Sequence, residues 1–123
     1  LTLWIDRTQI EQVLINLLKN AREACFRKSD AQIEIELTQT AEGSILTVSD
    51  NGEGILPDVI DKIFVPFFTT KPSGSGIGLS LCKQIMNLHG GTISVRSEKG
   101  AGSCFTLVFP VLSPTSQTVY VGI

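Results

Sequence analysis

The first part of the chain carries apolar residues at helical spacing. Residues three or four positions apart share one face of a helix. Asp6 is followed three residues later by Gln9, the spacing of a capping box, so the helix is predicted to begin at Asp6 and to run to about Phe26. The apolar positions are Ile10, Val13, Leu14, Leu17, Leu18 and Ala21. A second, polar stripe beside them consists of Asn16, Asn20, Glu23 and Arg27.

Alternation of apolar and polar residues predicts strands at four places. The ranges are 33–38, 44–49, 92–97 and 103–109. Leu3–Ile5 is expected to add a short edge strand. Turn residues at 42–43 and 99–102 join the strands into two hairpin-like pairs, which excludes a purely parallel sheet. Asp50 has the parity of the apolar residues of the second strand, so its side chain should point toward the core, where an acid needs a partner.

Two more helices are predicted, a short one over 58–64 and a longer one from Gly78 to His89. The segment 65–78 between them begins aromatic and ends rich in glycine, so we expect a lid with glycine hinges, with at least one of Phe67 and Phe68 packed in the core. The elements predict an α+β fold, a two-layer α/β sandwich in which three helices cover one face of a mixed, mostly antiparallel sheet. Residues 1–110 form this domain, and 111–123 are expected to be a C-terminal extension or linker.

Composition narrows the class of protein. The 123 residues fit one domain with one core. A net charge of -2 argues against a nucleic-acid partner, and no apolar run approaches the roughly 20 residues of a membrane helix. Three cysteines far apart favour small core residues in a reducing, cytoplasmic compartment over a disulfide framework or a zinc site. The first residue is Leu1 rather than Met, so we interpret the chain as a fragment of a longer protein.

The first segment with residues suited to binding a ligand is Asp50-Asn51-Gly52-Glu53-Gly54. A carboxylate at the end of a strand is held by the sheet and can accept a hydrogen bond from an amino group of a ligand. Gly52 and Gly54 permit close approach of a ligand to the main chain. An ordinary tight turn explains such a segment about equally well. The choice between a turn and a binding site therefore depends on whether other segments supply the rest of a nucleotide site.

Two other segments carry complementary chemistry. Asn16 and Asn20, one helical turn apart, offer side-chain oxygens suited to a hard cation or to phosphates, although a solvated flank is the alternative. The run from Gly74 to Gly78 opens a helix, where backbone N–H groups bind phosphate. A Rossmann fingerprint is excluded, because no strand is predicted before Gly74 and because Leu79 stands where the third glycine should be. A P-loop is excluded, because no Gly-Lys-Ser/Thr follows.

In this order and spacing, the three segments resemble the ATP-binding domain of sensor histidine kinases, a branch of the Bergerat-fold superfamily that includes gyrase, MutL and heat-shock ATPases. The resemblance covers roughly 2–110 and extends to Leu88-His89-Gly90-Gly91. The run Phe67-Phe68-Thr69-Thr70-Lys71 is most similar to kinases of the nitrogen-regulation and sporulation type.

The resemblance implies a role for each motif residue. Asp50 would accept a hydrogen bond from the amino group of adenine, Asn20 would bind Mg²⁺, and Asn16 and Lys71 would act on the phosphates as catalytic residues. Ser103 would reach the adenine through water. The implied ATP contacts are Asn16, Asn20, Asp50, Gly52, Gly54, Ile55, Phe64, Thr69, Thr70, Lys71, Gly74, Ser75, Gly76, Ile77, Gly78, Leu79 and Ser103.

Position 16 separates branches of the superfamily. Its ATPases typically carry Glu there as a general base, whereas Asn16 cannot take a proton at neutral pH. The resemblance therefore implies transfer of the γ-phosphoryl group to a histidine on a phosphoacceptor domain upstream in the same protein, and then to a response regulator receiver domain. His89, the only histidine, is expected to be a helix-end residue and not the acceptor. The parent kinase is expected to be a homodimer and the fragment alone a monomer without autophosphorylation.

Two rival hypotheses remain from the sequence. One is a protein-serine kinase of the anti-sigma-factor type, which would form an acid-stable phosphoserine. The other is a nucleotide-gated interaction module without transfer activity, in which the complete protein would bind ATP and acquire no phosphate.

Overall fold

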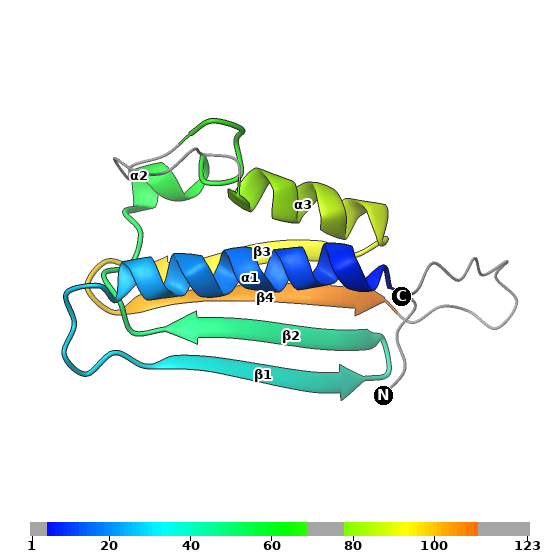
Figure 1. Ribbon diagram of the computed structural model, residues 1–123, viewed down its shortest axis with the longest axis horizontal. Helices are drawn as coiled ribbons and strands as arrows, with labels where there is room; N and C mark the ends of the chain where they lie inside the picture. Colours follow the sequence, from blue (N-terminus) through cyan, green and yellow to red (C-terminus); the bar gives the residue numbers. More distant parts are fainter. Residues whose placement is uncertain (1–4, 69–77, 111–123) are drawn as a thin grey trace, which may run out of the picture.

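The computed structural model describes residues 5–68 and 78–110 (Figure 1). Its elements follow in the order α1 (Arg7–Ala24), β1 (Ile33–Thr40), β2 (Gly43–Asp50), α2 (Pro57–Ile60), α3 (Gly78–Leu88), β3 (Thr92–Glu98) and β4 (Gly102–Pro110). The predicted α+β sandwich is confirmed. Its four-stranded sheet has the order β1-β2-β4-β3, and each neighbouring pair among these strands is antiparallel, so the described sheet lacks the parallel pair of a mixed sheet. The suggested strand at Leu3–Ile5 lies largely outside the described residues.

Helix α1 follows the predicted pattern closely. Asp6 is its N-cap, and the Asp6 side chain accepts a hydrogen bond of 3.2 Å from the N–H of Gln9. The helix ends at Ala24 and a turn follows through residue 27, so it is slightly shorter than expected. Its buried residues, Ile10, Val13, Leu17 and Ala21, belong to the predicted apolar stripe.

The core lies between the sheet and the two longer helices. Phe105, Leu107 and Phe109 alternate along β4 and point toward Cys82, Ile85 and Met86 of α3 and the apolar side of α1. Full burial of a side chain such as Leu or Phe stabilises a fold by about 1.5–3 kcal/mol. This packing fixes α1 and α3 against the sheet, and with them the polar residues that they carry.

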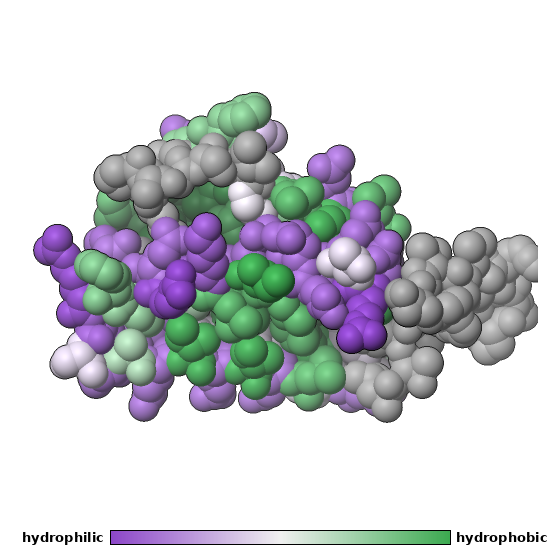
Figure 2. Space-filling view, viewed as in Figure 1, coloured by the Kyte–Doolittle hydropathy of each residue, from purple (hydrophilic) through white to green (hydrophobic). Residues whose placement is uncertain are grey.

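Within residues 5–68 and 78–110, β1 is covered only sparsely on its apolar side, which differs from the half-buried strand predicted. Ile33, Ile35 and Leu37 are 41%, 51% and 50% exposed, while Val48 on β2, the register partner of Ile35, is 1% exposed. Figure 2 shows apolar atoms over this edge of the sheet, below α1. The reason is position: β1 is the edge strand beside β2, whereas α3 packs on the β3 side of the sheet.

Helix α2 is shorter than the predicted 58–64. Pro57 occupies its first turn, as expected, and the helix ends at Ile60, after which turns continue to residue 67. Cys25 and Cys82 are buried, as predicted, whereas Cys104 is half-buried, and all three are free thiols. Within the described ranges, no helix has the length and apolar character that crossing a membrane requires.

Candidate functional site

Five of the described candidate residues come from three elements. Asn16 and Asn20 lie on α1, Asp50 ends β2, and Gly78 and Leu79 begin α3. In Figure 1 the end of β2 lies beside the second half of α1, with α2 above it. Figure 2 shows a hollow over this half of α1 with an apolar wall behind it. The candidates Thr69, Thr70, Lys71, Gly74, Ser75, Gly76 and Ile77 lie outside the described residues.

The Asp50 side chain is half-buried and its own loop holds it. Its Oδ1 accepts a hydrogen bond of 2.9 Å from the N–H of Gly52, an Asx-type turn that fixes the carboxylate relative to the main chain. Asp50 therefore ends β2, as the sequence predicted, but the hydrogen bond from Gly52 that holds its carboxylate comes from the following loop and not from the sheet.

The loop after Asp50 is packed against the end of α1. The N–H of Glu53 donates to the carbonyl of Ala24 over 3.1 Å. A Cβ on Gly52 would lie 2.5 Å from that same carbonyl oxygen, so only glycine fits there. Gly52 is thus required by protein packing, a reason that the sequence did not provide.

The other side of the loop rests on the turn between β3 and β4. The N–H of Gly100 donates to the carbonyl of Glu53 over 2.8 Å. Gly54 has a φ of 74°, and a Cβ there would overlap the carbonyl oxygen of Glu98. Gly102 leaves no room for a Cβ beside the carbonyl of Asp50. Contacts on both sides therefore make the Asp50 loop a rigid support.

Asn51 is a structural residue that sequence reasoning missed. Its Oδ1 accepts from the N–H of Gln32 over 2.8 Å, and its Nδ2 donates to the carbonyl of Asp30 over 3.0 Å. The thiol of Cys25 also donates to Oδ1 over 3.7 Å. Asn51 thereby ties the Asp50 loop to the connection between α1 and β1. Its position between Asp50 and Gly52 was the one available signal.

Asn16 links α1 to the start of α3. Its Nδ2 donates to the carbonyl of Gly78 over 3.3 Å, and its Oδ1 accepts from Nε2 of Gln12 over 3.1 Å. The thiol of Cys82, which donates to the carbonyl of Val13, lies in the same contact between the helices. Burial raises the pKa of Cys82 to about 11, although a hydrogen bond with Asn16 acts in the opposite direction. Cys82 is therefore a neutral thiol that packs the two helices together.

Comparison with known proteins identifies this arrangement. The family model described as "Histidine kinase-, DNA gyrase B-, and HSP90-like ATPase" matches residues 5–113. The chain belongs to this family. It is an ATP-binding domain of the histidine kinase type, as the resemblance in its sequence implied.

Curated relatives of this histidine kinase domain are sensor proteins. The chain is 42% identical over 108 residues to sensor histidine kinase ZraS of Salmonella typhimurium, which covers 88% of the chain and 23% of ZraS. It is 48% identical over 92 residues to the C4-dicarboxylate transport sensor protein DctB of Rhizobium meliloti, which covers 75% of the chain and 15% of DctB. The chain thus spans less than a quarter of the length of these relatives.

Solved structures of histidine kinases share the fold. The catalytic domain of histidine kinase ThkA, in a nucleotide-free form, has a TM-score of 0.75 at 39% identity and covers 86% of this chain and 68% of that one. The mycobacterial sensor histidine kinase MprB has a TM-score of 0.78 at 26% identity and covers 88% of this chain and 76% of that one. The chain therefore matches about two thirds or more of each.

Ser103 of this histidine kinase domain lies in a closed hydroxyl network. Its Oγ is 2.8 Å from Oγ of Ser97, which accepts from the N–H of Ile55 over 2.8 Å and donates to the carbonyl of Gly102 over 3.0 Å. Ser97 was not among the predicted residues. The network holds Ile55 on β3, and a water-mediated contact of Ser103 with adenine stays a prediction.

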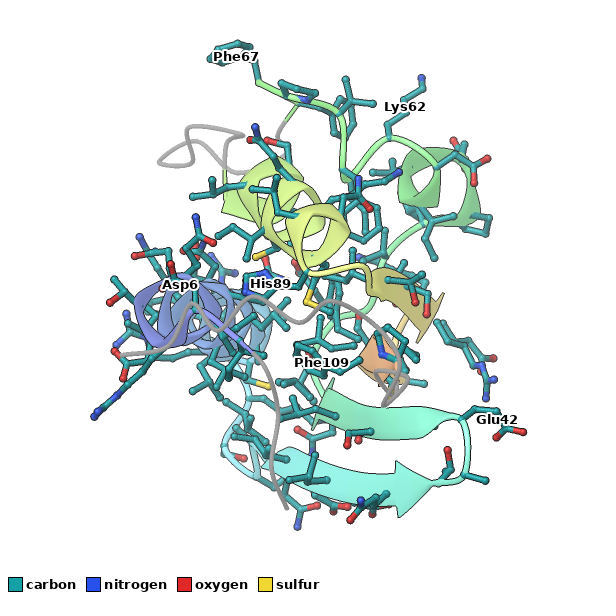
Figure 3. The ribbon with its side chains drawn as sticks, turned by 90° about the vertical axis from the view of Figure 1, so that its right-hand side faces the viewer. Asp6, Glu42, Lys62, Phe67, His89 and Phe109 are labelled. Carbon is teal, nitrogen blue, oxygen red and sulfur yellow. The ribbon has the colours of Figure 1, made fainter. Side chains whose placement is uncertain are left out.

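The aromatic residues near the site differ in burial. Phe64 packs edge-on against Phe105, with ring centroids 6.4 Å apart, and Nζ of Lys83 lies 5.8 Å from the Phe64 ring centroid. Phe67 is 75% exposed with a φ of 66° and points away from the core in Figure 3, whereas Phe68 is half-buried. Phe64 is thus the aromatic residue that the core holds firmly in this region.

The residues present fit a magnesium ion only together with phosphates. Among the described residues, no cluster of three or more His, Cys, Asp or Glu side chains could hold a metal. Asn20 would offer one neutral amide oxygen from the half-buried side of α1. Magnesium in nucleotide sites takes one or two protein oxygens and completes its shell with phosphate and water.

Proposed function

We propose that this domain binds Mg-ATP and donates the γ-phosphoryl group to a histidine on a separate dimerisation and phosphoacceptor domain. The rigid Asp50 loop supports this proposal most strongly, because Oδ1 is held by Gly52 at 2.9 Å while the loop is fastened to both α1 and the β3–β4 turn. A fixed acceptor selects a ligand by its donors and loses little entropy on binding.

Asp50 would recognise adenine through its exocyclic amino group. Guanine has a carbonyl oxygen at that position, so GTP would place two acceptors opposite each other, at a cost of about 1–3 kcal/mol. Gly52, Gly54 and Ile55 would lie along the base, with Phe64 beside it.

The phosphates would lie between α1 and the start of α3. Gly78 and Leu79 would present backbone donors at a helix N-terminus, together with Gly74, Ser75, Gly76 and Ile77. Asn20 would bind Mg²⁺, which neutralises phosphate charge when it is bound. Lys71, with Thr69 and Thr70, would supply further contacts to the phosphates.

Asn16 favours transfer over hydrolysis. Its amide cannot remove a proton from water, so the domain would protect ATP until an acceptor arrives. Phosphoryl transfer then proceeds by positioning and charge neutralisation. We place the domain in the cytoplasm as part of a homodimeric sensor kinase, with a response regulator receiver domain as the next acceptor.

Substitution of Asp50 tests the nucleotide site. Asp50→Asn puts an NH₂ donor where adenine offers a donor, so ATP affinity should fall about 10-fold or more, measured by calorimetry with Mg²⁺ and a non-hydrolysable analogue. Glu53→Gln makes the same change in charge on an exposed side chain three residues away and should leave affinity unchanged. Equal affinities for Asp50→Asn and the unmodified chain would rule out this site.

Chemical stability of the product tests the acceptor. Incubation of the longer kinase with labelled ATP should yield protein phosphate that acid removes and alkali preserves, as expected for phosphohistidine. Acid-stable phosphate would instead indicate serine transfer. ATP binding without any labelling would indicate an interaction module that uses nucleotide as a switch.

A further inference from the structure

The single histidine joins the end of α3 to the beginning of α1. Nδ1 of His89 is 2.8 Å from the carbonyl oxygen of Ile85, one turn earlier in the chain. Its Nε2 accepts a hydrogen bond of 2.9 Å from the backbone N–H of Asp6, the N-cap of α1. In Figure 3 Asp6 lies at α1, and His89 lies beside it below α3.

The two partners determine which ring nitrogen carries the hydrogen. The carbonyl of Ile85 can only accept, so Nδ1 must donate to it. The N–H of Asp6 can only donate, so Nε2 must carry a lone pair. This arrangement requires the neutral imidazole, because a proton on Nε2 would face the N–H of Asp6 donor to donor.

The contact lies at one end of an antiparallel pair of helices whose other end is the phosphate side of the site. Asn16 contacts Gly78 at that second end. Asp6 and Asn16 are ten residues apart, and Gly78 and His89 are eleven apart. At 1.5 Å per helical residue the two spans are about 15 Å and about 16.5 Å, so the two contacts lie at corresponding positions along both helices.

The charged groups around His89 are not placed to form a new ion pair with a protonated ring. The Asp6 carboxylate already accepts from the N–H of Gln9 as the cap of α1, so turning it to an imidazolium would uncap the helix. Arg7 and Glu11, the next charged residues of α1, pair with each other over 3.0 Å and are exposed. The end of β4 beside Gly91 brings no charged residue.

We propose that neutral His89 is a positioning residue for the nucleotide site. It holds the start of α1 against the end of α3, and so fixes Asn16 and Asn20 relative to Gly78. A proton on Nε2 would replace the lone pair that binds the N–H of Asp6 with a second donor and let the helices shift, so nucleotide affinity falls at acid pH. The inference rests on the proposed function, because it concerns the same ATP site.

Two substitutions test the two hydrogen bonds of His89 independently. His89→Gln can place an acceptor near the position of Nε2 and does not titrate, whereas His89→Asn can keep a donor near Nδ1 and lacks the reach to Asp6. The affinity of each variant and of the unmodified chain for a non-hydrolysable ATP analogue with Mg²⁺ is measured at pH 5.5, 6.5 and 7.5, well below each thermal midpoint, which excludes unfolding.

Three results are expected. The unmodified chain binds about 3- to 10-fold more weakly at pH 5.5 than at pH 7.5, which corresponds to one net hydrogen bond. His89→Gln binds like the unmodified chain at pH 7.5 with a smaller dependence on pH. His89→Asn binds about 3- to 10-fold more weakly at pH 7.5. A pH dependence identical in the unmodified chain and His89→Gln, or full affinity of His89→Asn, overturns the proposal.

A measurement without nucleotide keeps this inference distinct from the proposed function. The backbone amide NMR signals of Asp6 and Gly78 are followed through the same pH range in all three proteins. Both signals should move together in the unmodified chain and stay fixed in His89→Gln. Movement of Asp6 alone shows a local contact without influence on the site and refutes the positioning role, whereas failure of the unmodified chain to bind ATP refutes the proposed function instead.

Discussion

Replacement of Gly52 by alanine tests whether packing against α1 fixes the Asp50 loop. The added Cβ would lie 2.5 Å from the carbonyl oxygen of Ala24 and 2.9 Å from the Ala24 Cβ. Real Cβ contacts essentially never fall below 3.0 Å, so the loop must retreat by at least 0.5 Å. The φ of Gly52 is not in the left-handed region, so the cost comes from packing and not from backbone strain.

The size of the effect follows from two contributions. Forcing an extra group into a packed site typically costs about 1–3 kcal/mol. A retreat of the loop also stretches the 3.1 Å hydrogen bond from Glu53 to Ala24 beyond useful length, a loss of about 0.5–1.5 kcal/mol. We expect Gly52→Ala to lower the free energy of unfolding by about 2–4 kcal/mol, which leaves a typical domain folded.

The affinity for ATP should fall when Gly52→Ala displaces the Asp50 loop. The N–H of Gly52 holds Oδ1 of Asp50 at 2.9 Å, so displacement of residue 52 displaces the carboxylate that we propose to recognise adenine. A shift of half an ångström or more should weaken ATP binding about 10-fold, since hydrogen bonds depend steeply on geometry. Urea unfolding followed by circular dichroism gives the stability, and calorimetry gives the affinity.

Gly100→Ala is the matched control. Gly100 supports the same loop through its N–H, and a Cβ there would meet nothing within 4 Å, but its φ of 89° imposes backbone strain. This variant should lose about 1–2 kcal/mol of stability and retain its affinity for ATP. If Gly52→Ala matched it in both measurements, packing of the loop on α1 would not be what positions Asp50.

Three other changes test the core and the loop. Leu107→Ala, at a fully buried position, should lower the free energy of unfolding in urea by about 2–5 kcal/mol. Leu37→Ala, at a half-exposed position, should lower it by less than about 1 kcal/mol. Similar values for the two variants would show that β1 is covered. Asn51→Ala removes hydrogen bonds of 2.8 and 3.0 Å and should cost about 1–3 kcal/mol, which unchanged urea unfolding would contradict. Cys82, whose pKa is about 11, should react with iodoacetamide at pH 8 far more slowly than Cys104 in the native protein, as peptide mass spectrometry measures, and equal rates would contradict its burial. Because the unfolded thiol ionises near 9.0, stability from this group falls as the pH rises above that value.

Local patterns predicted the elements well. The Asp6 cap and the apolar spacing located α1, because both signals act within a few residues of each other. Period-two alternation located β1, β2, β3 and β4 to within about two residues at each end, a usual margin for strand ends. The order β1-β2-β4-β3 follows from tertiary packing and was not available from alternation.

Other features depend on partners far away in the sequence. Alternation shows which face of β1 is apolar, and it cannot show that the apolar residues on this face stay about half exposed among the described elements. The role of Gly52 in ligand access stays a prediction, and the backbone of Ala24 against it is a second reason for glycine that the sequence did not signal. Asn51 and Ser97 bind main-chain groups from other segments, and nothing in their own surroundings in the sequence signals those contacts.

Asn16 donates a hydrogen bond to the main chain of Gly78 and does not act as a base, and a glutamate would meet neither condition. Its Nδ2 donates to the carbonyl of Gly78 over 3.3 Å, whereas a carboxylate has no donor and would repel that oxygen. Asn16→Glu introduces the base of the hydrolytic branch, and it also removes the tie between α1 and the start of α3. We therefore expect this variant to bind ATP more weakly and to gain no steady hydrolysis, measured by phosphate release with Mg²⁺. Rapid hydrolysis at unchanged affinity would show that the contact with Gly78 is dispensable and that the amide serves only to withhold a base.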